Sequence, residues 1–118
     1  MLKFIIAGLL FILSNQPALA GGNDTVIFQG IVNSTDGMPY HLFINERKIL
    51  LDERVEVMDH KERDKDLSDI KNGKWLYIVS EETLSGPKAI RIYLLPGNVK
   101  HSEKRNYPFM HKEEAGDE

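Results

Sequence analysis

The second half of the chain carries four side chains suited to ligand binding, at alternating positions of two apolar stretches. Trp75 and Tyr77 occupy one face of the first stretch, and Arg91 and Tyr93 occupy one face of the second, because successive side chains of a strand point to opposite sides. If the aliphatic faces point into a core, the four side chains gather on the outside of neighbouring strands. Aromatic rings beside a guanidinium bind extended ligands by stacking and cation–π contact. The spacing therefore predicts a binding face for a peptide, a glycan or a partner protein.

A second interpretation of these rings stays open, because large aromatic side chains are commonly packed rather than exposed. They would then form a second hydrophobic layer, covered by the aromatic cluster Tyr107–Met110 or by the loop after Asp59. The cluster lies within residues 97–118, a polar stretch that ends in an acidic run. We predict that this stretch is a disordered tail; the alternative is a linear motif that folds onto a partner.

Metal binding is an alternative hypothesis, because imidazole and thioether ligands together suit Cu(I). The histidines are scattered, and the chain contains no His-x-His or His-x-x-His pair. It also lacks the Trp-Pro-x-Met-x-Met stretch of the exported bacterial OB-fold copper chaperones. We therefore predict no metal site and no cofactor, and keep a periplasmic copper carrier as an alternative function. The candidate ligands are His41, His60, His101, His111, Met58 and Met110.

Catalytic motifs are absent from the sequence. There is no Gly-x-Ser-x-Gly, no glycine-rich phosphate loop and no His-Glu-x-x-His. The acidic residues of the stretch 59–66 alternate with basic ones, whereas a catalytic carboxylate needs burial or a like-charged neighbour to shift its pKa. We therefore predict that the protein is not an enzyme.

The first twenty residues have the pattern of a cleaved signal peptide. Lys3 is followed by the uncharged run Phe4–Leu13, and Ala18-Leu19-Ala20 is a small-x-small cleavage site. The run is about half the ~20 apolar residues of a transmembrane helix. We therefore expect cleavage after Ala20, no stable membrane insertion afterwards, and a periplasmic or secreted protein.

The net charge and the lack of cysteine further limit the class of protein and the compartment to which it belongs. The full chain of 118 residues has a net charge of −3, and removal of Lys3 with the leader makes it more acidic. An acidic chain without a basic stripe argues against nucleic-acid binding. The chain has no cysteine, which excludes disulfides, thiol chemistry and lipid attachment. A cysteine-free exported domain fits a bacterial periplasm better than a eukaryotic secretory route.

Strand patterns recur through residues 21–96, separated by turn signals. Gly30 inside the first run suggests a bend of the kind that small barrels use to turn corners. Leu67 and Ile70 predict a single helical turn that begins near Asp66 or Ser68 and ends at Gly73. The expected strands are Thr25–Val32, Tyr40–Ile44, Lys48–Leu51, Val55–Met58, Trp75–Val79 and Ala89–Leu95.

Short strands at this spacing with one helical turn favour a small all-β, OB-like barrel of five to six strands. The signal peptide would occupy residues 1–20, the barrel 21–96 and the tail 97–118. The expected core residues are Val26, Phe28, Val32, Leu42, Ile44, Ile49, Leu51, Val55, Val57, Leu67, Ile70, Leu76, Ile78, Ile90, Ile92 and Leu94.

Three stretches carry a resemblance to a known group of proteins: DGMPYHLFINERKILLDERVEVMDH, DLSDIKNGKWLYIVSEET and GPKAIRIYLLP. Together they resemble the exported bacterial OB-like domains of unknown function, over about Val26 to Leu95. The resemblance implies a barrel fold and supplies no catalytic residues, because none is defined for those domains. We expect a non-enzymatic exported binding or interaction module; a structural or stress-linked envelope protein is a further alternative.

Overall fold

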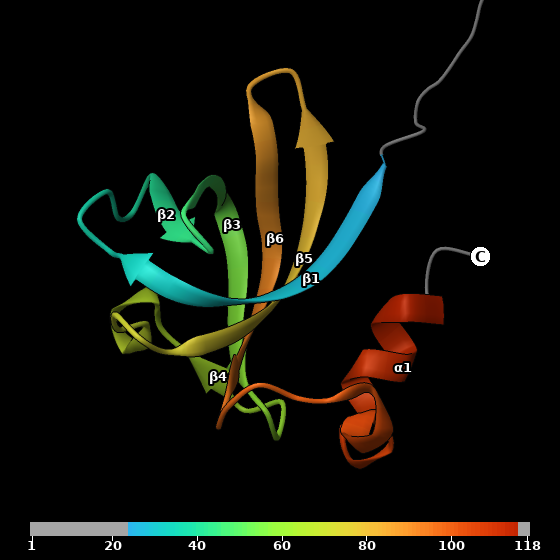
Figure 1. Ribbon diagram of the computed structural model, residues 1–118. Helices are drawn as coiled ribbons and strands as arrows, with labels where there is room; N and C mark the ends of the chain where they lie inside the picture. Colours follow the sequence, from blue (N-terminus) through green and yellow to red (C-terminus); the bar gives the residue numbers. More distant parts are fainter. Residues whose placement is uncertain (1–23, 116–118) are drawn as a thin grey trace, which may run out of the picture.

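The computed structural model describes residues 24–115, and within them strands predominate (Figure 1). The predicted signal peptide lies outside the described residues. Two 3-10 helices and one short α-helix complete the described part of the chain. The strands are β1 (Thr25–Ser34), β2 (His41–Ile44), β3 (Arg47–Asp59), β4 (Asp64–Lys65), β5 (Trp75–Thr83) and β6 (Gly86–Leu95); the helical elements are η1 (Leu67–Asp69), η2 (His101–Asn106) and α1 (Pro108–Ala115).

Five of the strands close into a barrel. The hydrogen-bonded order is β2-β1-β5-β6-β3-β4, and an additional pairing of β2 with β3 closes the ring. All neighbours in the ring run antiparallel except β3 and β6, which are parallel. The short β4 adds to the end of β3 outside the ring. This arrangement confirms the prediction of a small all-β, OB-like barrel with a short helical turn.

Two local features let β1 and the β2–β3 hairpin close the ring. A Cβ atom on Gly30 would lie 2.4 Å from Cγ2 of Ile44, so only glycine fits where β1 passes from β5 to β2. Asn45 and Glu46 have φ angles of 52° and 64°, the left-handed pair typical of a two-residue hairpin turn. The Asn45 side chain also bonds the backbone of Gln29 and Ile31. The bend predicted at Gly30 is therefore a barrel corner.

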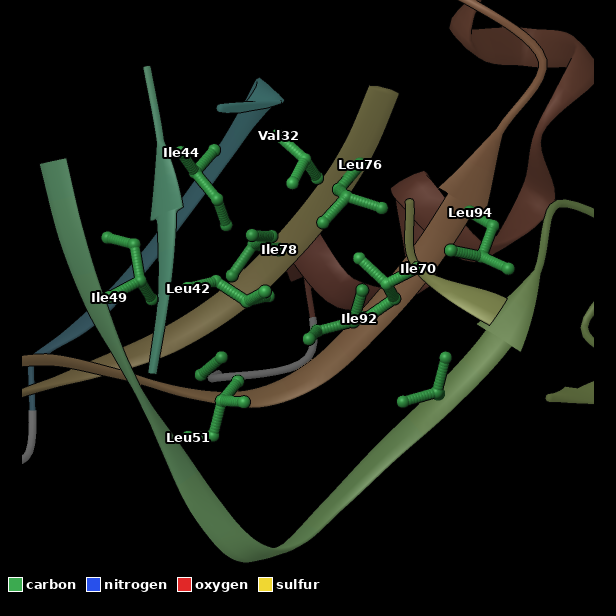
Figure 2. Packing of buried hydrophobic residues seen from close by; sticks show 12 residues of the cluster. Val32, Leu42, Ile44, Ile49, Leu51, Ile70, Leu76, Ile78, Ile92 and Leu94 are labelled. Carbon is green, nitrogen blue, oxygen red and sulfur yellow. The ribbon is translucent and has the colours of Figure 1, made fainter. Parts of the chain in front are cut away.

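The barrel interior is filled by aliphatic side chains. Figure 2 shows Ile44, Ile78 and Ile92 among the side chains that lie between the strands. Most of the predicted core residues belong to this interior cluster, which consists of Val32, Leu42, Ile44, Ile49, Leu51, Val57, Ile70, Leu76, Ile78, Ala89, Ile92 and Leu94, with Phe28, Met38, Val55 and Leu67 packed against it.

Two of the predicted core positions are wrong. Val26, the second residue of β1, is 37% exposed. Ile90 is the extra residue of a bulge, because β5 pairs Val79 with Arg91 and Ser80 with Ala89. The bulge shifts the alternation of β6, so Ala89 enters the interior and Ile90 packs on the outside.

The predicted strands Lys48–Leu51 and Val55–Met58 are one strand, β3. Its pairing with β6 is irregular between Leu51 and Glu56, where the sequence turns polar. The irregular pairing with β6 therefore does not end strand β3.

The helical turn begins where it was predicted, because Asp66 is the N-cap residue of η1, and Ile70 after it is buried. The predicted end at Gly73 is wrong: η1 ends at Asp69, and Gly73, with a φ of 84°, lies in a separate turn before β5.

The segment that follows β6 is ordered, which corrects the prediction of a disordered tail for the described residues 97–115. It forms η2 and α1 and buries Val99, Phe109 and Met110. These three side chains reach an apolar surface on the outside of the barrel. In Figure 1 the segment leaves β6 and α1 lies beside the barrel. We call residues 96–115 the C-terminal segment.

Candidate peptide-binding face

The four predicted site residues lie together on the outside of the barrel. They come from β5 and β6, which pair Tyr77 directly with Tyr93. We call Trp75, Tyr77, Arg91 and Tyr93 the outer aromatic face. Tyr77 and Tyr93 are only 2% and 3% exposed, whereas Trp75 and Arg91 are half-buried. The C-terminal segment covers the face, as the second interpretation of the rings proposed.

Phe109 of α1 is the apolar centre of this contact. Its ring stacks on Tyr93, with centroids 4.1 Å apart and planes 12° from parallel. It also meets Tyr77 edge to face at 5.4 Å. Offset-stacked and edge-to-face pairs are the favoured arrangements of aromatic rings. Met110 next to it is fully buried. We call the buried apolar side chains on this side of the barrel the outer cluster; they are Tyr77, Val79, Tyr93, Leu95, Val99, Phe109 and Met110.

Two carboxylates of α1 bind the polar tips of the face. Arg91 donates two hydrogen bonds to Glu113, at 2.6 and 2.8 Å, and the Tyr93 hydroxyl donates a third. The Tyr77 hydroxyl donates to Glu114 at 2.7 Å, and Lys104 of η2 lies 3.1 Å from the same carboxylate. A two-point arginine–carboxylate pair is among the stronger and more directional polar contacts in proteins.

The electrostatics of these groups follow from the same contacts. Burial would raise the pKa of Glu113, but hydrogen bonds from Arg91 and Tyr93 outweigh it and lower that pKa. Burial likewise opposes a lowered pKa at Glu114, where the bonds from Tyr77 and Lys104 prevail. Burial and the carboxylate partners raise the pKa of both Tyr77 and Tyr93. At neutral pH both carboxylates are therefore ionised. They accept hydrogen bonds from the neutral tyrosine hydroxyls and from the cationic side chains of Arg91 and Lys104.

Gln29 of β1 holds the backbone at the start of the segment. Its amide nitrogen donates to the Val99 carbonyl, and its amide oxygen accepts from the Val99 N–H, both at 2.9 Å. The side chain thus pairs with a residue's backbone as a neighbouring strand would. This contact depends on a peptide backbone and not on the identity of the side chain at that position.

A groove runs beside the Arg91–Glu113 pair. It has a volume of about 380 Å³ and opens to solvent. Acidic side chains from β3 and from the turn after it face a basic side chain of α1 across it. The lining residues are Glu56, Met58, Glu62, Arg91, Tyr93, Lys112 and Glu113.

Sequence reasoning missed three contributors to this site: Gln29, Glu113 and Glu114. Phe109 and Glu113 are four residues apart, as are Met110 and Glu114, and residues at this spacing share one face of a helix. That spacing was a usable signal for α1. Gln29 gave no signal, because its role depends on where Val99 is placed.

The candidate metal ligands lie in several parts of the fold. Met110 belongs to the outer cluster, and Met58 packs against it. His41 lies against Phe43, with ring centroids 5.6 Å apart, and His60 lies against Tyr107 at 6.3 Å. Within residues 24–115, no group of three or more His, Cys, Asp or Glu is placed to hold a metal ion.

One buried carboxylate, Asp59, has a structural role. It accepts hydrogen bonds from the backbone of Arg63 and Lys61 and from the Arg63 side chain. These bonds, led by the one from the Arg63 backbone, lower its pKa to about 2. Asp59 therefore organises the turn between β3 and β4.

Comparisons of the chain with protein-family models, with curated proteins and with solved structures find no match. The resemblance to exported OB-like domains therefore stays a prediction. No helix within the described part of the chain is long and apolar enough to cross a membrane.

Proposed function

We propose that this protein is a non-enzymatic, exported binding module that holds a peptide segment of a partner protein on its outer aromatic face. One observation carries the proposal: the face already holds a peptide segment, which is the chain's own C-terminus. A backbone clamp at Gln29, a ring site at Tyr77 and Tyr93, and a carboxylate site at Arg91 act together. Each of these contacts is made through space and needs no covalent link to the barrel.

The contacts favour a peptide over a glycan. Gln29 pairs with an N–H and a carbonyl of one residue, a combination that every non-proline residue of a polypeptide offers. Phe109 fills the ring site edge-on to one tyrosine and stacked on the other, as an aromatic side chain of a partner would. The export of the module rests on the sequence of residues 1–20.

In this proposal the C-terminal segment is a tethered ligand. Residues 96–98 join the rest of this segment to the end of β6, and short tethers give effective concentrations in the millimolar range. A free peptide of equal affinity must reach about 1 mM to displace half of the tethered segment. A partner therefore binds well only if its segment fits the face better or if the tethered segment is weakened.

The test weakens the tethered segment and supplies the same segment in trans. The protein is the mature chain, residues 21–118, with Phe109→Ala; the probe is a labelled peptide of residues 98–115. Truncation of a buried Phe costs about 3–5 kcal/mol, so the intact peptide outcompetes the tethered one by more than a hundredfold. Fluorescence anisotropy should show half-saturation at about 10 μM peptide, which is roughly a hundredfold less than the native chain needs.

The matched control is Phe43→Ala, because Phe43 is a partly exposed ring on β2 and lies outside the outer cluster. This variant should bind the peptide no better than the native chain. Emission of Trp75, the only tryptophan, reports occupancy of the face directly. If the Phe109→Ala chain keeps its barrel and leaves millimolar peptide unbound, the proposal is wrong.

A further inference from the structure

We infer that the partner segment bound by the outer aromatic face is a short helix with a defined charge pattern. The pattern is an aromatic residue, an apolar residue, any residue, a basic residue and two acidic residues. In this chain α1 supplies it as Phe109, Met110, His111, Lys112, Glu113 and Glu114. The inference rests on the proposed function and adds the chemistry of the partner.

Helical geometry couples the first position of the pattern to the last two. The Tyr93 ring stacks on Phe109 while its hydroxyl donates to Glu113. The Tyr77 ring meets Phe109 at its edge while its hydroxyl donates to Glu114. In a helix, Phe109 rises about 6 Å to Glu113 and about 7.5 Å to Glu114, roughly one turn to one and a half turns. An extended peptide would place positions four apart more than 10 Å from each other, so only a helix satisfies both ends of each tyrosine.

Charge decides the remaining positions. Arg91 holds Glu113 through two of its nitrogens, a geometry that lysine cannot reproduce. Glu56 and Glu62 line the groove on the barrel side, and Lys112 lines it from α1. A basic residue immediately before the acidic pair therefore shares the groove with the carboxylates of Glu56 and Glu62, whereas an acidic residue there would be repelled by them.

The test is a charge swap between protein and peptide. Both proteins are the mature chain with Phe109→Ala and Glu113→Gln, so that the tethered segment no longer carries the charge under test. Arg91 is kept in one protein and replaced by Arg91→Glu in the other. The two peptides span residues 98–115, one native and one with Glu113→Lys. Arg91→Glu should weaken the native peptide by about ten- to a hundredfold, and the Glu113→Lys peptide should recover most of that loss.

Two further probes keep the result interpretable. Arg91→Lys retains the charge without the two-point geometry, so its affinity should fall between the other two proteins. A peptide of the same composition in scrambled order tests the helical spacing and should bind at least tenfold more weakly. Circular dichroism of each protein checks that the barrel is intact; Arg91 is half-buried at the surface, so each substitution should be tolerated.

The outcomes separate the inference from the proposed function. If Arg91→Glu binds both peptides equally, or if the scrambled peptide binds as tightly as the native one, the charged-helix pattern is wrong although the face still binds peptides. If the protein with Arg91 binds none of the peptides, the proposed function itself fails. Recovery by the swapped peptide supports both.

Discussion

The two sides of the sheet β5–β6 carry two different kinds of apolar cluster. The interior cluster is made of aliphatic side chains with a few larger apolar residues at its edge, and the closed backbone ladder surrounds it. The outer cluster is rich in aromatic rings whose polar tips bind carboxylates of the C-terminal segment. The first can be opened only by breaking the barrel. The second can be opened by moving one short segment, so the fold and the binding face are separable parts of one small protein.

The difference between the two clusters predicts that a substitution inside the barrel causes the largest loss of stability. Ile78 is fully buried in the interior cluster, and Ile78→Ala should cost about 2–5 kcal/mol of the free energy of unfolding. Urea unfolding followed by far-ultraviolet circular dichroism measures this loss. Phe109→Ala should shift the same barrel transition less, because its cost falls on the attachment of the C-terminal segment and reaches the barrel only up to the free energy of that attachment. Equal shifts of the unfolding transition in the two variants would contradict the distinction between the clusters.

A smaller effect is expected from Glu113→Gln, which keeps the size of the side chain and removes its charge. The paired Arg91 side chain is 35% exposed, so solvent screens part of the loss, and a cost of about 1 kcal/mol is reasonable. The open form of the C-terminal segment should become roughly fivefold more populated. Acrylamide quenching of Trp75 would report this change. Glu82→Gln, at an exposed site on β5, should leave quenching unchanged, and an equal response from both variants would contradict the assignment.

A change of pH should distinguish attachment of the C-terminal segment from stability of the barrel without any substitution. Glu113 and Glu114 have lowered pKa values in the folded protein, so their contribution is complete above the ordinary value of about 4.3 and is lost as pH falls through the folded values. Tyr77 and Tyr93 have raised pKa values, so their contribution is present below about 10 and is lost as pH rises through the folded values.

The contacts that hold the C-terminal segment should therefore be at full strength between about pH 4.3 and 10, and attachment should weaken progressively as pH passes through the folded pKa values on either side. Trp75 quenching against pH measures attachment, and circular dichroism measures the barrel. Asp59 keeps its charge down to a pKa of about 2, so the turn it organises should outlast the segment in acid. Loss of both signals at one acidic midpoint would contradict the separation.

The barrel could be predicted from the sequence wherever local signals agree with the fold. Trp75–Val79 alternates between the two clusters as expected, and the helical turn η1 begins after Asp66 as expected. Ile90 was misplaced because a bulge is set by pairing with β5, a partner that is distant in the sequence. Strand β3 was divided because its irregular, polar middle looks like a turn.

The C-terminal segment was the least predictable part of the site. An eight-residue helix such as α1 is too short to be stable alone, so its stability comes from the surface it covers. Phe109 and Met110 are two apolar residues in a polar stretch, and nothing local says which surface they meet. The site residues Trp75, Tyr77, Arg91 and Tyr93 were grouped correctly because alternation on two adjacent strands is a local property.

Native-state hydrogen exchange of the mature chain tests the central claim most directly. Local openings expose amides at a free energy below that of global unfolding. The account predicts that the amides of α1 exchange through such an opening while the amides of β5 and β6 that pair within the barrel stay protected to the global limit. Exchange of α1 and the barrel strands at one common free energy would mean that the C-terminal segment is a fixed part of the barrel, and the account would be contradicted.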